Sequence, residues 1–534
     1  MVRLFTTIAG LHCYLDLQRS HFHQAIGNLP PDANRAQGVG FVPTMGALHA
    51  GHLSLIHQAR RENSLVVVSI FVNPLQFGPH EDLSRYPRTL AQDQQLCEQA
   101  GVDAIFAPSA EELYRGRQGA QMTQVIPPPA MTTHLCGAFR QGHFPGVATV
   151  VTKLLALVQP DRAYFGQKDA QQLAIIRQLT ADLNLPTQIV GCPIIREPNG
   201  LALSSRNQYL SEDEKEQAAV LYRSLRRAEQ LFEMGERSAS ALIEAGKLEL
   251  VTVPAIRLEY LELVDPMTML PTQKVEEGGL LAVAAHLGST RLIDNVLLKS
   301  RRKPIVAIDG PAGAGKSTVT RKIAQALGLL YLDTGAMYRA ITWLVLQSGI
   351  SVSDEPAVAE LVSQCHIELI PNTDPQAPPQ VWVNGRDVTQ EIRDPEVTSQ
   401  VSTIAAQPFV RQELVKQQQR YGREGGIAIE GRDIGTHVFP DAELKIFLTA
   451  SVAERAKRRQ RDLKEQGKGE TRLDELERTI AERDHKDSTR ALAPLRKAED
   501  AIELNTDGLT IPEVMDRIID LYRDKTAVLN ISGN

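Results

Sequence analysis

The sequence predicts two α/β units with parallel sheets, joined near residue 300. Apolar runs of strand length, such as Leu65 to Val72 and Ile305 to Ile308, alternate with helical stretches in both halves of the chain. Continuous apolar strands of this kind are expected where both faces of a parallel sheet are covered. The chain of 534 residues is also longer than one hydrophobic core usually serves, which favours more than one domain.

The expected elements follow in order along each half. The first sheet is predicted from 39–42, 65–72, 104–107 and 188–190, and the second from 305–308, 426–429 and 444–448. A helix is expected from Gly315 to about Leu327. The pair Asn384-Gly385 stands between β-rich residues, after a polar stretch at 371–379, and predicts a hairpin inserted into the second sheet.

The boundary between the halves is placed at 299–303. The segment Val296 to Lys303 is short and basic and has no Gly/Ser-rich stretch, so a tight tether is expected rather than a long flexible linker. The predicted domains are therefore 1–299 and 303–534.

Composition indicates an ordinary soluble protein. Hydrophobic residues make up 43% and charged residues 23% of the chain, and the formal net charge is −6, which argues against binding nucleic acid by phosphate neutralisation. The five cysteines are scattered, form no CxxC pair and indicate reduced thiols. No signal peptide and no apolar run of about 18 residues is apparent. A cytoplasmic enzyme without membrane or nucleic-acid partners is expected.

A first nucleotide site is predicted at the strand-to-helix turn PTMGALHAGH, residues 43–52. His49 and His52 fall on one side of this turn, where they can hydrogen-bond nucleotide phosphates that also face a helix N-terminus. Such a pair can stabilise the negative charge that grows on the α-phosphate of ATP during adenylyl transfer. A zinc site is the main alternative, and it is disfavoured because no cysteine or third histidine stands at a suitable spacing nearby.

Three further polar segments of the first half support an ATP site with a neighbouring polar pocket. Asn73 and Gln76 follow a buried strand, at the edge where parallel sheets bind ligands. The segment 166–172 contributes a cation, a carboxylate and amides, and 203–207 contributes two hydroxyls and a guanidinium. Each segment alone is equally compatible with a solvated loop, so their combination carries the prediction.

With these motifs the first half resembles the pantothenate synthetase family (pantoate–β-alanine ligase) over essentially its whole length. The matching stretches are PTMGALHAGH, SIFVNPLQF, YPRTL, GHFPGVATVVTKL, FGQKDAQQL and LALSSRN. The resemblance implies a Rossmann-like nucleotidyltransferase domain at about 1–200, a small α+β lid subdomain at about 201–299, homodimers through this half, and Mg²⁺. It implies that ATP and pantoate form pantoyl adenylate and pyrophosphate, and that β-alanine then attacks the adenylate to give pantothenate and AMP.

The resemblance also assigns roles on the nucleotide side. His49, His52 and Lys168 are the implied catalytic residues, with His52 as general acid. The implied ATP-binding residues are Met45, Gly46, Ala47, Leu48, His49, Gly51, His52, Gly166, Gln167, Lys168, Asp169, Ile195, Leu203, Ser204, Ser205 and Arg206.

On the acid side, the resemblance implies that Gln76 and Gln172 hold pantoate, with Gln76 also near β-alanine. Arg140 and His143 are expected on the pantoate side. The chain departs from the family at Gln167, where Glu is usual, and this change is expected to tune the pocket rather than to remove activity.

The second half carries a phosphate-binding loop, GPAGAGKST at 310–318, between an apolar strand and a helix. This context separates a working loop from a chance match. Its backbone N–H groups can cradle the β-phosphate of ATP, Lys316 can bridge the β- and γ-phosphates, and the Ser317 hydroxyl is the expected Mg²⁺ position. The expected ATP-binding residues are Gly310, Gly313, Gly315, Lys316, Ser317 and Thr318.

Polar clusters elsewhere in the second half predict the phosphoryl acceptor site. LDTGAMYR at 332–339 and EGRDIG at 430–435 each follow a strand and should project from the carboxyl edge of the sheet. Basic segments at 455–461 and 483–490 can offset charge on the transferring group and exclude water. With GPAGAGKST, LDTGAMYRA, IEGRDIGT and ERDHKDSTR, the chain from about 303 to 530 resembles bacterial cytidylate kinase.

This second resemblance implies phosphoryl transfer from ATP to CMP or dCMP. It assigns catalytic roles to Lys316, Arg483 and Arg490, and it implies an extra small antiparallel sheet near 365–390. The residues implied around CMP are Thr334, Arg339, Ser402, Arg411, Arg432, Asp433 and Asp487. One alternative for the second half is a dephospho-CoA kinase, which is disfavoured by the GRD cluster, the DTGAMYR segment and the hairpin. Another alternative is that one half of the chain is a non-catalytic regulatory module.

Overall fold

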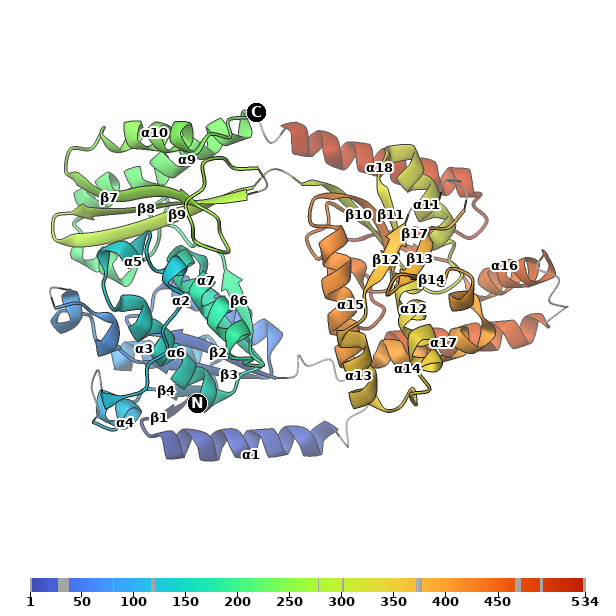
Figure 1. Ribbon diagram of the computed structural model, residues 1–534, viewed down its shortest axis with the longest axis horizontal. Helices are drawn as coiled ribbons and strands as arrows, with labels where there is room; N and C mark the ends of the chain where they lie inside the picture. The colour runs from blue at the N-terminus through green and yellow to red at the C-terminus, as the bar shows by residue number, and fades with distance from the viewer. Residues whose placement is uncertain are drawn as a thin grey trace. The chain divides into compact units, whose positions relative to one another are not determined.

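A computed structural model of the chain describes residues 2–26, 38–79, 81–116, 121–276, 278–299, 302–370, 372, 377–465, 472–489 and 493–531. The chain forms two compact units that divide between Ser300 and Arg301. Figure 1 shows that each unit consists of sheets flanked by helices. None of the described helices is long and apolar enough to cross a membrane.

The first unit is built on a six-stranded sheet in which all neighbouring strands are parallel. The spatial order is β1-β4-β3-β2-β5-β6. The strands are β1 (Arg3–Phe5), β2 (Val39–Thr44), β3 (Leu65–Ile70), β4 (Ala104–Phe106), β5 (Arg162–Gly166) and β6 (Gln188–Cys192). The predicted parallel sheet is confirmed, although the third strand ends at Ile70 rather than Val72. The apolar pattern did not reveal β1, which is short and largely exposed, or β5.

Helices cover both faces of this sheet, and alternation along β3 separates two cores. Leu65 and Val67 belong to a core that includes residues of α1 and α6, whereas Val66 and Val68 belong to a core that includes residues of α2 and α3. The helices are α1 (Ile8–Ile26), α2 (Ala50–Glu62), α3 (Leu90–Gln99), α4 (Ala110–Tyr114), α5 (Cys136–Phe139), α6 (His143–Val158) and α7 (Ala170–Asp182).

The end of the first unit is a small α+β subdomain, which we call the lid subdomain. Its antiparallel sheet has the order β7-β8-β9, and α9 and α10 lie along it (Figure 1). The elements are α8 (Glu212–Ala218), α9 (Val220–Glu233), α10 (Ala239–Leu250), β7 (Ile256–Val264), β8 (Gly278–Leu287) and β9 (Thr290–Lys299). It has its own apolar core, which begins at Leu201 and ends at Leu298.

The second unit has a five-stranded parallel sheet in the order β11-β15-β10-β16-β17. The strands are β10 (Lys303–Asp309), β11 (Leu330–Asp333), β15 (Gly425–Gly431), β16 (Leu444–Thr449) and β17 (Ile502–Asn505). The helices are α11 (Lys316–Leu327), α12 (Thr334–Gln347), α13 (Glu355–Ser363), α14 (Pro395–Ala406), α15 (Pro408–Tyr421), α16 (Val452–Glu465), α17 (Leu473–Thr489) and α18 (Ile511–Ile531). The strand that leads into the phosphate-binding loop is the central one.

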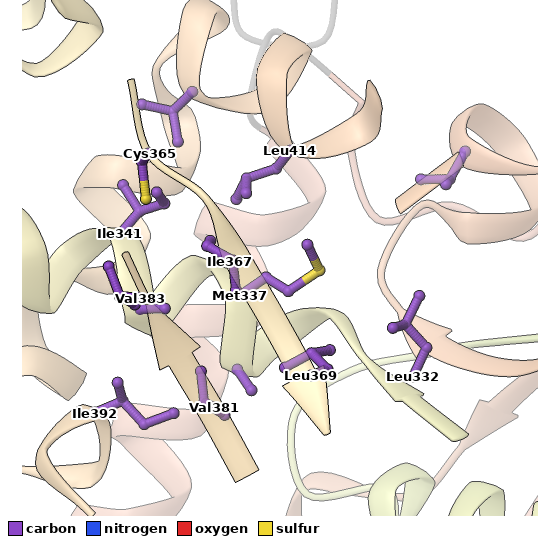
Figure 2. Packing of buried hydrophobic residues seen from close by; sticks show 14 of the residues in the cluster. Leu332, Met337, Ile341, Cys365, Ile367, Leu369, Val381, Val383, Ile392 and Leu414 are labelled. Carbon is purple, nitrogen blue, oxygen red and sulfur yellow. The ribbon is translucent and has the colours of Figure 1, made fainter. Parts of the chain in front are cut away.

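The predicted hairpin forms, and the extra small antiparallel sheet that the second resemblance implies is confirmed, but the prediction that the hairpin is inserted into the second sheet was wrong. Strands β12 (Ile367–Ile370), β13 (Gln380–Val383) and β14 (Arg386–Asp387) make a separate antiparallel sheet. Asn384 and Gly385 both have positive φ, 50° and 81°, which is the backbone of a tight hairpin turn. Figure 2 shows Ile367 and Val383 of this sheet beside Met337 and Ile341 of α12, in one apolar core.

Candidate active sites

The turn between β2 and α2 is held in shape by a residue that the sequence did not indicate. Gly46 and Ala47 have positive φ values of 82° and 50°. The Asp93 carboxylate, on α3, accepts the N–H groups of Ala47 at 3.0 Å and Leu48 at 2.8 Å. Asp93 is only 1% exposed, so this buried carboxylate fixes the loop that carries the histidines.

His49 and His52 cap the first turn of α2 with their ring nitrogens. The Gly51 N–H donates to Nδ1 of His49 at 3.1 Å, and the His49 N–H donates to Nδ1 of His52 at 3.4 Å. A neutral ring whose Nδ1 accepts carries its proton on Nε2. Burial, followed by the charge of Lys168, lowers the pKa of His49 to about 4. Burial and the neighbouring His49 lower the pKa of His52 to about 3, so both rings are neutral at pH 7.

A cavity of about 230 Å³ lies at the carboxyl edge of the first sheet and gathers most of the predicted residues. Gly46, Ala47, Leu48 and Gln167 do not line it. The Gln167 side chain instead donates to the Gly191 carbonyl at 3.4 Å. Predicted residues that line the cavity are Met45, His49, Gly51, His52, Gln76, Arg140, His143, Gly166, Lys168, Asp169, Gln172, Ile195, Leu203, Ser204, Ser205 and Arg206.

Asn73 orients Gln76 inside this cavity. Asn73 is 1% exposed; its Oδ1 accepts the Tyr114 hydroxyl at 2.8 Å, and its Nδ2 donates to Gln76 Oε1 at 3.1 Å. The Gln76 Nε2 lies 3.1 Å from the Met45 sulfur. A Cβ at Gly146 would lie 2.3 Å from the Leu75 carbonyl oxygen, so only glycine allows α6 to approach this segment so closely.

Two carboxylates after β3 pair with the arginines of the cavity. Asp82 accepts from Nε and Nη2 of Arg206 at 2.9 and 2.8 Å. Glu81 accepts from Nε of Arg140 at 2.8 Å and from its Nη2 at 2.5 Å. Burial raises the pKa of both carboxyls, but the arginine hydrogen bonds and charges outweigh it, so both pKa values lie below their usual range. Neither acid was predicted, because acids in a polar segment have no distinguishing pattern.

His143 connects the Glu81–Arg140 pair to Gln76. Its Nε2 lies 3.0 Å from Nη1 of Arg140, and its Nδ1 lies 2.8 Å from the Gln76 carbonyl oxygen. Burial and the charge of Arg140 lower the pKa of His143 to about 4. A neutral ring with its proton on Nδ1 satisfies the Gln76 carbonyl and leaves Nε2 to accept from Arg140.

In the second unit, the phosphate-binding loop follows the central strand β10. Gly310 has a φ of 149°, and a Cβ there would lie 2.1 Å from the Leu448 carbonyl oxygen. Gly315, the N-cap of α11, has a φ of 90° and provides no side-chain cap. Lys316 is 5% exposed and donates to the Pro311 carbonyl at 2.8 Å. Burial and the charge of Arg432 lower the pKa of Lys316 to about 7.

Buried acids lie beside this loop at the ends of β10 and β15. Glu430 accepts the Ser317 hydroxyl at 2.9 Å and also accepts the Tyr331 hydroxyl. Asp309 accepts the N–H groups of Ile434 and Gly435 at 2.8 and 2.7 Å. Burial raises the pKa of each carboxyl to about 6. Among the described residues, no group of three or more His, Cys, Asp or Glu is arranged to hold a metal by itself.

The predicted acceptor residues form ion pairs across the second site. Arg411 pairs with Asp433, and Arg432 lies 3.0 Å from Asp487. The Thr334 hydroxyl donates to the Glu430 carbonyl at 2.7 Å. Arg339 and Ser402 are half-buried on α12 and α14.

Arg483 on α17 has a buried Nε without a hydrogen-bond partner among the described residues. Burial and the charge of Arg432 lower its pKa. An unsatisfied guanidinium N–H in this position is chemically suited to an incoming anion. Arg490, the other predicted catalytic arginine, lies outside the described residues.

Arg455 behaves differently from the rest of its basic helix. It is 3% exposed and donates to the Ala450 and Ala312 carbonyls at 3.0 and 3.1 Å. It also makes a two-bond ion pair with Asp484 of α17. The sequence indicated a basic segment that closes on the phosphates, whereas this arginine ties α16 and α17 to the phosphate-binding loop.

These two arrangements define an ATP-using enzyme with two nucleotide sites, one built on histidine side chains and one on a P-loop. The family model for pantoate-beta-alanine ligase matches residues 18–297, and that for cytidylate kinase matches residues 306–524. The chain belongs to the bifunctional pantoate ligase/cytidylate kinase family. Both predicted activities are thereby confirmed, and the dephospho-CoA kinase alternative is not supported.

The relatives match along almost the whole chain. Bifunctional pantoate ligase/cytidylate kinases from Trichormus variabilis and from Nostoc sp. are each 62% identical over 533 residues, which is 98% of this chain and 99% of theirs. The crystal structure of pantothenate synthetase from Thermus thermophilus is 45% identical, with a TM-score of 0.50; the match covers 56% of this chain and all of that one. The two bifunctional relatives therefore match both halves of the chain, whereas the solved structure matches about half of it.

Proposed function

We propose that the cavity of the first unit performs both steps of pantoate–β-alanine ligation, with ATP bound against His49 and His52. The observation that carries this assignment is the cluster of two neutral Nε2–H donors, Lys168 and Arg206 around one cavity. A pantoate carboxylate oxygen attacks the α-phosphorus, and pyrophosphate leaves. The β-alanine amine then attacks the acyl carbon of pantoyl adenylate, and AMP leaves.

The residues of the cavity divide this work by their chemistry. The two histidines donate to phosphate oxygens, and Lys168 with Arg206 offsets the charge that develops on the α-phosphate. Gln76 and Gln172 hold pantoate in line for attack. The enclosure keeps water away from the acyl adenylate, which hydrolyses readily. Because His52 is neutral without ligand, its action as general acid requires that bound phosphate first raises its pKa.

The second unit transfers the γ-phosphoryl group of ATP to CMP or dCMP. We assign the β- and γ-phosphates to Lys316 and the backbone of the loop, and the transferring group to Arg483 and Arg490. The paired charges Arg411–Asp433 and Arg432–Asp487 border the CMP side, together with Thr334, Arg339 and Ser402. Arginines that are already ion-paired are held in place for phosphate recognition.

The oxygen donors beside the second loop fit Mg²⁺. The Ser317 hydroxyl and the Glu430 carboxylate are hydrogen-bonded at 2.9 Å, and Asp309 lies at the end of the central strand. Hard oxygen donors, few in number, suit an ion that keeps several waters and binds substrate phosphates. We propose that Ser317 and Glu430 hold it, where bound Mg²⁺ would neutralise charge on the β- and γ-phosphate oxygens.

Domain limits, assembly and location are also proposals. The division 1–299 and 303–534, with a lid from about 201, agrees with the two compact units and the separate core of the lid subdomain. Homodimers through the first unit are inferred from the family resemblance alone. Light scattering of the purified full chain tests this: a mass of one chain would contradict the dimer. A cytoplasmic location is proposed from the composition.

The two activities are tested on the purified full chain. AMP release should require both pantoate and β-alanine, and ADP formation should occur with CMP or dCMP. UMP and dephospho-CoA serve as alternative acceptors in the same assay. Phosphorylation of dephospho-CoA but not of CMP would contradict the kinase assignment, and AMP release that is independent of β-alanine would contradict the ligase assignment.

A further inference from the structure

A strand of the lid subdomain holds the turn that carries Lys168. The Asn295 side chain, on β9, donates from Nδ2 to the carbonyl oxygens of Gln167 at 3.0 Å and Lys168 at 2.8 Å. A primary amide nitrogen has two hydrogens, so one side chain can satisfy both carbonyls. Asn295 is 7% exposed, and water therefore has little access to replace these bonds.

Asn295 is itself fixed by a buried ion pair. The Asp294 carboxylate, 4% exposed, accepts from both Nη atoms of Arg196 at 2.6 and 3.0 Å and from the Asn295 N–H at 2.8 Å. The Arg196 guanidinium also lies 4.0 Å from the centre of the Tyr222 ring. In the sheet, Asn295 is paired with Ala282 of β8. The amide thus projects from a rigid strand.

The turn that Asn295 contacts has no side-chain cap of its own. The short helix η5 (Gln167–Asp169) connects β5 to α7, and neither η5 nor α7 begins with a side-chain hydrogen bond. Lys168 and Asp169, both lining the ATP cavity, lie on this turn. Their two side chains are 3.7 Å apart. Support for the turn therefore comes from the lid subdomain.

We propose that Asn295 is a positioning residue for the adenylation step, acting by holding the Lys168 turn from the lid subdomain. The proposal rests on the phosphate-binding role given to Lys168 above. Its consequence is that the lid subdomain sets the position of a catalytic cation, in addition to enclosing the substrates. Placing a reacting group wrongly by about 1 Å can cost on the order of 100-fold in rate.

Asn295→Asp is the sharpest test, because it keeps the shape of the side chain, removes both donors and puts a carboxylate beside two carbonyls. The two half-reactions are measured separately: pantoate-dependent exchange of pyrophosphate into ATP, and attack of β-alanine on supplied pantoyl adenylate. We expect kcat of the exchange to fall on the order of 100-fold, with little change in KM for pantoate and in the second half-reaction. CMP phosphorylation should stay unchanged.

Lys168→Ala and the double variant separate positioning from general destabilisation. If Asn295 acts through Lys168, adding Asn295→Asp to Lys168→Ala should produce no further loss. A further loss of the full size, or an equal fall of both half-reactions with a lowered unfolding temperature, would overturn the inference. Normal exchange in Lys168→Ala would instead overturn the role given to Lys168. Loss in Lys168→Ala with normal exchange in Asn295→Asp would overturn the inference alone.

Two further variants keep the test decisive. Leu297→Ala changes an exposed residue of the same strand and should leave the exchange rate normal. Asn295→Ser retains one donor on a shorter side chain and serves if Asn295→Asp does not fold. An intermediate exchange rate in Asn295→Ser supports the inference, and an unchanged rate contradicts it.

Discussion

Both nucleotide sites lie where a strand of a parallel sheet turns into a helix, but they are built from different chemical groups. In each unit a strand within a parallel sheet leads through a glycine-containing turn into a helix: β2 into α2, and β10 into α11. In the first unit, the rings of His49 and His52 accept hydrogen bonds from backbone N–H groups at the start of α2. In the second, the helix begins at Gly315 without a side-chain cap.

The two proposed sites therefore differ in the groups that donate hydrogen bonds to phosphate. Where the histidines accept backbone N–H groups through Nδ1, their Nε2–H groups are the donors that we propose for ATP. Where no side chain caps the helix, backbone N–H groups and the dipole of α11 stay available for phosphate. The first site therefore depends on ring placement, and the second on the path of the backbone.

The largest expected effects are reciprocal. Lys316→Ala removes the buried ammonium to which we assign the β- and γ-phosphates, so CMP phosphorylation should fall on the order of 1000-fold while ligation is kept. His52→Ala removes one of the two ring donors and should reduce ligation by a similar factor while CMP phosphorylation is kept. Steady-state assays of both activities on each variant measure this.

The activity of the unchanged site in each variant is the control for an intact chain. Loss of both activities in either variant would contradict independent sites, because it would show that one unit depends on the state of the other.

Gly51→Ala sharpens the comparison at the first site. An added Cβ would lie 2.8 Å from Cε1 of the His49 ring and must displace it, so ligation should fall on the order of 10- to 100-fold. The helix itself should tolerate alanine, since Gly→Ala at an unstrained helical position stabilises by about 0.4–1 kcal/mol. Ligation kinetics and thermal unfolding together measure this; a destabilised first unit would contradict the argument.

Gly310→Ala is the matched change at the second site, with the opposite signature. Gly310 has a φ of 149°, and an added Cβ would lie 2.1 Å from the Leu448 carbonyl oxygen. This oxygen belongs to the backbone, so no flexible side chain can move to make room. Here the second unit should lose about 1–3 kcal/mol of stability together with its activity. A variant that is inactive but fully stable would show that the loop can shift without strain.

The pH dependence of ATP use should distinguish the sites further. The pKa of Lys316 is about 7 without nucleotide, and bound triphosphate raises it, so binding above pH 7 takes up a proton. The KM for ATP in CMP phosphorylation should then rise by up to about tenfold per pH unit above 7. Lys316→Arg keeps its charge throughout and should show a flat profile. A flat profile in the unsubstituted chain would exclude this linkage.

The residues that the sequence revealed and those it did not differ in how locally they act. The apolar runs at β2 and β3 and the loop around Lys316 are continuous in the chain, so their pattern alone predicts strand, turn and phosphate site. Asp93 and Asn295 act on turns far away in sequence, and an isolated acid or amide carries no spacing signal. Only the folded position of β9 brings the Asn295 amide to the Gln167 and Lys168 carbonyls.

One arginine of the basic segment at 455–461 could not be distinguished from its neighbours for a related reason. A basic helix predicts a solvated or phosphate-facing surface, yet Arg455 is buried because Asp484 and two carbonyls compensate its charge. The hairpin was found from its Asn-Gly turn, while its place in a separate sheet depends on packing against α12. In both cases the outcome depends on contacts with other helices and strands, and the local sequence pattern carries no information about those contacts.

The smallest expected effect is on stability, and it has opposite signs in the two units. His49 and His52 have folded pKa values of about 4 and 3, below the unfolded value of about 6.5. The unfolded chain therefore binds more protons, and the first unit loses stability as pH falls from 6.5 toward 4. Asp309 and Glu430 have folded pKa values raised to about 6, so acidification through this range relieves the cost of burying their charges.

Scanning calorimetry of the ligand-free chain at pH 7 and pH 5 measures both units at once. Between pH 7 and pH 5, the unfolding temperature of the first unit should fall by on the order of 5 °C relative to that of the second unit. His52→Asn removes one titrating ring and should reduce this difference, whereas His57→Asn, elsewhere on α2, should leave it unchanged. If the two transitions moved together, burial of the histidines would not be what distinguishes the side-chain site from the backbone site.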